Sequence, residues 1–401
     1  MVRKKRTFKF WMGQLHLWLG LASGIVVVIV SITGCLYVFQ KEISEAVYDK
    51  QYFIKPPAGA VTLPLSQLQA RAQEVLGKDK PLNDITVYRQ PDRSWEFMAY
   101  NFNDTALTYF GAVGYFQSVF IDPYTGAVLG TRDYKYDFFS VVKYLHWSLL
   151  LNTPYGQPIV GWSTLIFVLL LFTGLILWWP KKWTKALRDR SFKIKWKASF
   201  KRVNYDLHNV PGFYTLIPAL IIGLTGMVFA FSWFQSVVYV AASGTTTPPP
   251  QVSVVSKDTT AQVAAPLDIA YQEALKQFPD ARRLLVIPAA GKGGTIYMLG
   301  YKSRETYYGS DALQFDQYSG KLLHRRNDRE KNRGEKLIEM NYDIHVGAIG
   351  GIVGKIIAFI VSLICATLPV TGFIIWWGKQ KKKAPRKPAV KGMVIAAKEV
   401  L

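Results

Sequence analysis

The chain has 401 residues, half of them hydrophobic, and a formal net charge of +22. Nearly all of the excess positive charge is concentrated in three short segments, 1–10, 180–202 and 378–401, which together hold 23 Lys and Arg residues and only two acids. Each segment borders an apolar stretch, which indicates that the charge directs membrane insertion and excludes nucleic acid as the partner of a basic face.

The apolar residues form four long stretches, each of at least about 20 residues, the length that crosses a bilayer as a helix. Basic flanks mark the cytoplasmic side of such helices, so both termini and the 180–202 loop are expected in the cytoplasm. The first stretch is too long for a signal peptide and lacks an Ala-x-Ala-like cleavage site, so we expect a retained anchor. The stretches lie at roughly 11–39, 159–179, 210–240 and 352–377.

This pattern predicts an α-helical membrane protein with four spanning helices and two α+β units outside the membrane. In chain order we expect a cytoplasmic N-terminus and first spanning helix (1–40), a first outer unit (41–140), a second spanning helix (141–180), a basic cytoplasmic loop (181–202), a third spanning helix (203–241), a linker and second outer unit (242–337), a fourth spanning helix (338–378) and a basic cytoplasmic tail (379–401).

The two outer segments repeat one pattern, an amphipathic helix followed by two hairpins. Each unit is therefore expected to pack one helix against a small antiparallel sheet. Residues 243–250, "SGTTTPPP", are expected to form an extended linker. The matched segments are 63–77 with 265–280 for the helices, 84–100 with 283–301 for the first hairpins, and 121–130 with 315–324 for the second hairpins.

Four of the five histidines begin a predicted membrane helix, and each precedes a Thr-Gly pair at a repeated spacing. The spacings to the threonine are 17 residues in the first and third helices and 27 and 26 in the second and fourth, which indicates an internal duplication. The histidines, each with its Thr-Gly pair, are His16 with Thr33-Gly34, His146 with Thr173-Gly174, His208 with Thr225-Gly226, and His345 with Thr371-Gly372.

In the predicted topology His16 and His208 lie near the cytoplasmic face, and His146 and His345 lie near the outer face. A single interfacial histidine is most often hydrogen-bonded or directed toward the headgroups, but four at matched positions favour ligands. Zinc usually takes four ligands, often with Cys or carboxylates among them, whereas a haem b needs two imidazoles, which facing helices of a bundle can supply. The sequence predicts two haems b, one for each pair.

The glycines fit this hypothesis by their depth in the membrane. Gly34 follows His16 by 18 residues, about 27 Å of helix, so Gly34 and Gly226 should reach the outer pair. Gly174 and Gly372 should likewise reach the cytoplasmic pair. Glycine leaves room beside a porphyrin, although a Thr-Gly pair can also serve helix packing, and spacing does not separate these roles.

The whole pattern resembles the PepSY-associated transmembrane family. The hairpin sequences "IDPYTGAVLG" (121–130) and "FDQYSGKLLH" (315–324), alternating with histidine-bearing helices, carry the resemblance over roughly 10–378. The family includes iron-regulated inner-membrane proteins and siderophore reductases of Gram-negative bacteria. The resemblance implies PepSY-like periplasmic units, the bacterial inner membrane and a ferric siderophore as electron acceptor, without the fused flavin-type reductase domain of some relatives.

Ligation by two histidines fills both axial positions of the iron and leaves electron transfer as the default role. We expect electrons to pass from the cytoplasmic side to a periplasmic acceptor, with quinol or a flavin reductase docking on the 180–202 loop as donor. No catalytic acid or base is expected. The alternatives are electron transfer to another periplasmic acceptor, such as copper or a redox partner, and a non-enzymatic PepSY binding or regulatory module in the lipid bilayer.

Other motifs are expected to have structural roles. Asp206 and Asp343, in "NYDLH" and "NYDIH", are expected to be helix N-caps. The Trp pairs 178–179 and 376–377 are expected to lie in an interfacial belt. Cys35 and Cys365 are expected to be small buried hydrophobic residues. The outer haem is expected in a partly extramembrane vestibule, because His146 and His345 precede their apolar stretches by 13 and 7 residues.

Overall fold

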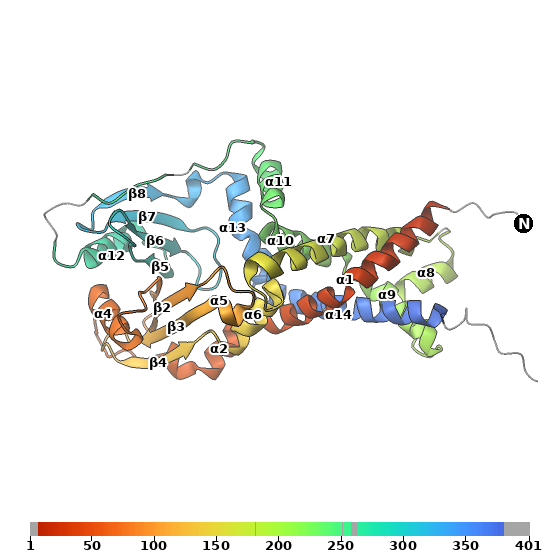
Figure 1. Cartoon of the computed structure of the whole chain (residues 1–401), viewed down its shortest axis with the longest axis horizontal. Coiled ribbons are helices and arrows are strands. Elements are labelled where there is room, and N and C mark those ends of the chain that lie inside the picture. The colour runs from red at the N-terminus through yellow and green to blue at the C-terminus, as the bar shows by residue number, and fades with distance from the viewer. Residues whose placement is uncertain (1–6, 181, 251, 258–262, 381–401) are drawn as a thin grey trace, which may run out of the picture.

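An elongated bundle of apolar helices carries a β-sheet at one end (Figure 1). The computed structural model describes residues 7–180, 182–250, 252–257 and 263–380. Both ends of the described chain lie at the end of the bundle away from the sheet (Figure 1). This agrees with termini on one side of a membrane, while their cytoplasmic orientation stays a prediction. The basic residues 1–6 and 381–401, which include most of the predicted tail, lie outside the described residues.

Three described helices are long and apolar enough to cross a membrane, with mean hydropathies of 2.3 to 2.4 in their most apolar windows. Two further helices, α9 and α10, pass the same test together but bend by 69° where they meet. The chain is therefore a multi-pass membrane protein with three spans, or four if the bent pair is one span. The three single spans are α1 (Phe8–Val38), α7 (Thr153–Trp178) and α14 (Gly351–Gln380), and the bent pair is α9 (Phe200–Tyr214) with α10 (Leu216–Ala230).

The expected continuous helix over 141–180 is wrong, because it is two helices. His146 lies on α6 (Phe138–Ser148), and α7 starts after a turn in which Leu149 and Leu150 have φ values of 57° and 59°. Asn152 starts α7 by accepting the backbone N–H of Thr153 at 2.8 Å. The left-handed pair of leucines carries no sequence signal, but Asn152 followed by Pro154 is typical of a helix start.

The expected helices over 203–241 and 338–378 are also broken. Pro218 lacks the N–H that would bond back to the Tyr214 carbonyl, and α9 gives way to α10 at Thr215. A third helix, α11 (Ser232–Ser243), follows an extended Phe231, so the apolar span ends near Ala230 rather than 240. His345 is the last residue of α13 (Arg333–His345), which a short 3₁₀ turn, η2 (Ala348–Gly350), separates from α14.

The two outer segments form one continuous antiparallel sheet of eight strands, instead of the two small sheets expected from the sequence. Its order is β4-β3-β2-β1-β5-β6-β7-β8. Each half therefore has its fourth strand at an outer edge and its first strand at the centre of the sheet. The halves join where β1 pairs with β5, with Ile85 opposite Val286. The strands are β1 (Asp84–Tyr88), β2 (Trp95–Phe102), β3 (Val113–Ile121), β4 (Val128–Asp133), β5 (Arg283–Ile287), β6 (Thr295–Tyr301), β7 (Asp311–Asp316) and β8 (Leu322–Arg326).

One face of the sheet packs on the two predicted amphipathic helices, α4 (Leu65–Leu76) and α12 (Pro266–Gln277). They lie on the side away from the membrane helices (Figure 1). Leu68, Phe97, Leu284 and Phe315 are fully buried in one core shared by both halves. The remaining elements are α2 (Gln40–Val47), α3 (Asp49–Tyr52), α5 (Tyr109–Ala112), α8 (Lys185–Phe192) and the 3₁₀ turn η1 (Asp328–Glu330).

Candidate cofactor site

The four membrane histidines form the two pairs that the sequence predicts. The ring centroids of His16 and His208 are 6.2 Å apart, and those of His146 and His345 are 6.0 Å apart. The rings of each pair are steeply inclined, at 89° and 72°. The fifth histidine, His324, lies on β8 opposite Gln314 and belongs to neither pair.

Each of the four histidines contacts the threonine of a Thr-Gly pair on a different helix through its Nδ1 atom. The same threonine hydroxyl donates to a carbonyl one turn earlier in its own helix, at 2.7 to 3.0 Å. Its lone pairs are therefore free to accept from an Nδ1–H. The contacts are His16–Thr173 (2.9 Å), His146–Thr33 (3.1 Å), His208–Thr371 (3.0 Å) and His345–Thr225 (2.9 Å).

Backbone carbonyls fix the protonation of the rings. Nδ1 of His146 lies 2.9 Å from the Val30 oxygen, and Nδ1 of His208 lies 3.0 Å from the Leu368 oxygen. A carbonyl oxygen only accepts, so Nδ1 must carry the proton. The neutral ring then has its lone pair on Nε2, the form that binds a metal, and the hydrogen bonds to Nδ1 set the orientation of that lone pair.

The four glycines lie against the imidazole rings themselves, and their expected role beside a porphyrin stays a prediction. A Cβ on any of them would lie 3.2 to 3.5 Å from the Cε1 atom of a histidine, at or near the limit of a normal contact. Gly34 and Gly226 are at the outer pair and Gly174 and Gly372 at the other, at the expected depths. The Thr-Gly pair is thus a histidine receptor, in which Thr binds Nδ1 and Gly leaves room for the ring.

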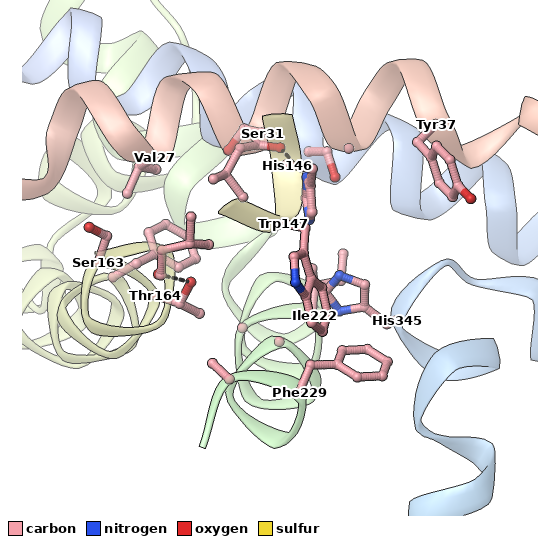
Figure 2. A pocket seen from close by; sticks show the side chains of 18 of the residues that line it. Val27, Ser31, Tyr37, His146, Trp147, Ser163, Thr164, Ile222, Phe229 and His345 are labelled. Atoms are coloured by element: carbon pink, nitrogen blue, oxygen red, sulfur yellow. Dashed lines mark hydrogen bonds between the residues drawn. The ribbon is translucent and has the colours of Figure 1, made fainter. Parts of the chain in front are cut away.

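The outer pair opens into a cavity of about 630 Å³ inside the bundle. Figure 2 shows His146 and His345 projecting into this space, with Phe229 beside them. The walls are mostly apolar, and Gly34 and Gly226 contribute to them. This volume lies within the ~300–1,000 Å³ typical of cofactor pockets.

The donor set fits a haem held between two imidazoles. Among the described residues, no three His, Cys, Asp or Glu side chains gather as they do around a structural metal ion. A metal–imidazole bond is about 2 Å long, and the ring centre lies roughly 1 Å behind the bonded nitrogen, so two axial rings have centroids about 6 Å apart. The observed 6.0 and 6.2 Å agree with that separation.

Comparison with known families matches residues 14–379 to the PepSY-associated TM region. The chain belongs to this family. The match covers all four paired histidines and all four Thr-Gly pairs. A search of curated proteins gave no significant match.

Two asparagines that the sequence analysis did not predict link the histidine-bearing helices of this PepSY-associated protein to the helices that carry the Thr-Gly pairs. Asn204 Nδ2 donates to the Thr371 carbonyl, and Asn341 Nδ2 donates to the Thr225 carbonyl, each at 3.1 Å. In "NYDLH" and "NYDIH" the Asn precedes the His by four residues, so both project from one helix face. That spacing was the signal that would have found them.

The expectation that Asp206 and Asp343 are N-caps is wrong. Both are fully buried in helices that begin six and ten residues earlier, α9 at Phe200 and α13 at Arg333. Asp206 Oδ2 accepts from the Lys195 backbone N–H at 3.1 Å. Asp343 Oδ2 accepts from the backbone N–H groups of Tyr307 and Tyr308 at 2.8 and 3.1 Å. Each carboxylate therefore fastens an extramembrane loop to a histidine helix.

The predictions for the tryptophans, as an interfacial belt, and for the cysteines, as buried residues, are confirmed only in part. Trp178 is not in an exposed belt: it is buried, stacks on Phe213 with 3.8 Å between ring centroids, and donates to the Ser191 carbonyl at 3.1 Å. Trp179 and Trp377 are half-exposed, as a belt requires. Cys35 and Cys365 are buried and free, which confirms the prediction for them.

Proposed function

We propose that this protein holds two haems b, one between His16 and His208 and one between His146 and His345, and transfers electrons through the membrane. The observation that carries the proposal is the fourfold histidine receptor, which fixes Nε2 of each ring as the free nitrogen and opposes the rings in pairs. The histidines of each pair would hold the haem, and a bound haem would supply one-electron redox chemistry. No side chain is required to act as a nucleophile, acid or base.

The bundle places the two pairs at different depths along one helix. His16 lies on α1, and His146 contacts Gly34 on the same helix, so the pairs are separated by about 27 Å along the helix axis. The walls of the outer cavity are mostly apolar, and the threonines hold the rings in one orientation. These features serve electron transfer because they limit how far the surrounding groups must move when the charge of the iron changes.

The direction of transfer follows from the predicted topology. Electrons would enter near His16 and His208 from quinol or from a flavin reductase docked on the basic loop around 180–202. They would leave near His146 and His345, next to the sheet. The proposed acceptor is a ferric siderophore, on the strength of the family alone, and another periplasmic acceptor is the alternative. One electron converts Fe³⁺ to Fe²⁺, which hard oxygen ligands hold less tightly because the ion is larger and less charged.

Haem content tests the proposal directly. A pyridine haemochromogen assay against protein concentration should approach two haems per chain. His16→Ala and His208→Ala should disturb one haem and His146→Ala and His345→Ala the other, while His324→Ala should leave both spectra intact. Colourless protein from haem-replete cells would instead support a non-enzymatic PepSY binding or regulatory module.

The exit point is tested with dithionite-reduced protein and ferric siderophore under anaerobic conditions. Reoxidation of the haem, with ferrous iron trapped by a chelator, is expected. If His146→Ala protein reduced the siderophore as fast as the wild type, the outer pair would not be the exit and the proposed path would be wrong.

A further inference from the structure

The cavity of the outer pair continues past the histidines along α1, from Val27 to Tyr37 (Figure 2). Three tyrosines and one lysine line this end: Tyr37 on α1, Lys143 and Tyr144 on α6, and Tyr342 on α13. Figure 2 shows Tyr37 beyond His146 along α1, at the end of the cavity away from Val27. The Tyr37 and Tyr342 hydroxyls are hydrogen-bonded to each other, so the donors left for a ligand are Lys143, Tyr144 and one hydroxyl of that pair.

Lys143 has no counter-ion in the part of the chain that the structure describes. Its ammonium nitrogen, Nζ, lies 5.2 Å from the centroid of the aromatic ring of Tyr144. No Asp or Glu is among the described residues that line the cavity. A cation beside an apolar cavity is costly unless something pairs with it.

Three buried cations of the first outer segment and of α14 are each paired with an acid. Lys355 bonds to Glu42, Arg132 bonds to Asp137 at 2.6 Å, and Arg93 bonds to Glu45 at 2.8 Å. These pairs neutralise charges that folding has buried. Lys143 instead is an exposed residue that lines the cavity and has no acid partner among the described residues.

The tyrosine rings beside Lys143 are held in place, so their hydroxyls are preorganised. Tyr144 stacks on Tyr109 with 4.2 Å between centroids, and Tyr342 meets the edge of Tyr307 at 5.3 Å. An ammonium group and fixed hydroxyl donors together form a site for an anionic oxygen group, because charge-assisted hydrogen bonds are strongest with carboxylates and similar oxyanions.

We propose that Lys143, with Tyr37, Tyr144 and Tyr342, forms a carboxylate-binding site at the outer end of the cavity. The site deepens the proposed function and rests on it for the identity of the ligand. The carboxylate has two possible sources, a propionate of the haem held by His146 and His345, or an acidic group on the incoming ferric chelate. Both sources bring an anion to the same place.

The test compares wild type with Lys143→Met, Lys143→Arg and the control Lys78→Met, in bilayers of zwitterionic lipid. Lys78 is an exposed residue after α4, far from the cavity in sequence and fold. Two quantities are measured. The first is the midpoint potential of the outer haem. The second is the concentration of chelate that gives half the maximal rate of reoxidation of the reduced protein, for ferric citrate and for a neutral ferric trihydroxamate.

If the site holds a propionate, Lys143→Met lowers the midpoint potential, because loss of a nearby cation favours the more positive ferric state, and the two chelates are affected equally. If the site holds an acceptor carboxylate, the concentration of ferric citrate for half-saturation rises about tenfold or more relative to that of the neutral chelate. Lys143→Arg should retain the wild-type value in either case.

The proposal is overturned if Lys143→Met behaves as Lys78→Met does in both measurements, which is the result for a lysine that merely reaches lipid headgroups. Failure of the proposed function is separate, since it appears as wild-type protein without haem. In that event, citrate is titrated against the fluorescence of Trp147, which lines the cavity, with Trp147→Phe as the blank. Binding that Lys143→Met weakens about tenfold supports the site, and equal or absent binding refutes it.

Discussion

Thr225 Oγ1 lies 2.9 Å from Nδ1 of His345, and the same hydroxyl donates to the Ile221 carbonyl at 2.8 Å. The threonine is therefore an acceptor for the imidazole N–H, and its own helix holds it in that role. An acceptor on Nδ1–H makes Nε2 more electron-rich, which strengthens a metal–nitrogen bond and stabilises the ferric state. The repetition of this contact at all four histidines suggests that it tunes both proposed haems.

Thr225→Val should therefore raise the midpoint potential of the outer haem and weaken its retention by roughly tenfold or more, as loss of a ligand's hydrogen-bond partner does at metal sites. Thr371→Val should do the same to the inner haem alone, the one proposed between His16 and His208. Redox titration followed in the visible spectrum measures both. Thr367→Val is the control, because Thr367 is exposed on the same helix as Thr371 and bonds to the Ile364 carbonyl. Equal shifts in control and test variants would contradict the assignment.

Gly372→Val should remove the inner haem and leave the outer one. A Cβ at Gly372 would lie 3.2 Å from Cε1 of His208, so the branched side chain of valine must displace the ring from its receptor. The expected haem content falls from two per chain toward one. Gly378 is the matched control on the same helix, since a Cβ there meets nothing within 4 Å. If Gly378→Val lost haem equally, helix propensity and not the histidine contact would be the cause.

The depth and pairing of the histidines were predictable because a helix rises by a fixed amount per residue. The 18 residues between His16 and Gly34 determine that the two lie at opposite ends of a span, whatever the packing. The breaks around the other histidines were only partly predictable, because Pro218 marks the one between α9 and α10 whereas the left-handed turn between α6 and α7 has no such residue. Leu149 and Leu150 adopt left-handed backbone conformations that leucine rarely takes, and only the surrounding tertiary structure accounts for them.

In the outer segments, too, the local elements were predictable from the sequence and the contacts between distant elements were not. Helix α4, helix α12 and the first hairpin of each half follow from local periodicity and turn residues, and they lie where the pattern predicts. The second hairpins start earlier than predicted, with β3 from Val113 instead of 121 and β7 from Asp311 instead of 315. The pairing of β1 with β5 joins residues about 200 positions apart, such as Ile85 and Val286. No local pattern specifies such a partner, because an exposed edge strand can pair with any complementary edge.

Asp343→Ala should loosen the loop between β6 and β7 without unfolding the sheet. The substitution leaves the backbone N–H groups of Tyr307 and Tyr308 without their acceptor, at a cost of about 1–3 kcal/mol for each unsatisfied group. Hydrogen exchange should become faster at these two amides and in α13. Asp280→Ala, at an exposed position after α12, serves as control. Unchanged exchange at Tyr307 and Tyr308 would show that the carboxylate does not fasten the loop.

Glu96 should make the stability of the sheet depend on pH. Burial raises the pKa of Glu96 above its ordinary value of 4.5, although the Tyr134 hydroxyl donates to its Oε1 at 2.8 Å. A raised folded-state pKa means that the fold favours the protonated form. The stabilisation is therefore complete below pH 4.5 and is lost as pH rises from 4.5 through the higher folded-state pKa.

Glu96→Gln should remove this dependence, because the amide keeps an oxygen that accepts from Tyr134 but cannot ionise. Above the folded-state pKa the variant should unfold at a higher temperature than wild type, and the difference should shrink as the pH is lowered toward 4.5. Thermal unfolding followed by intrinsic fluorescence between pH 4 and 8 measures it. Glu74→Gln, at a position exposed on α4, is the control. A variant less stable than wild type at every pH would mean that the charged carboxylate, held by Tyr134 and nearby Arg132, is the favoured form in the fold.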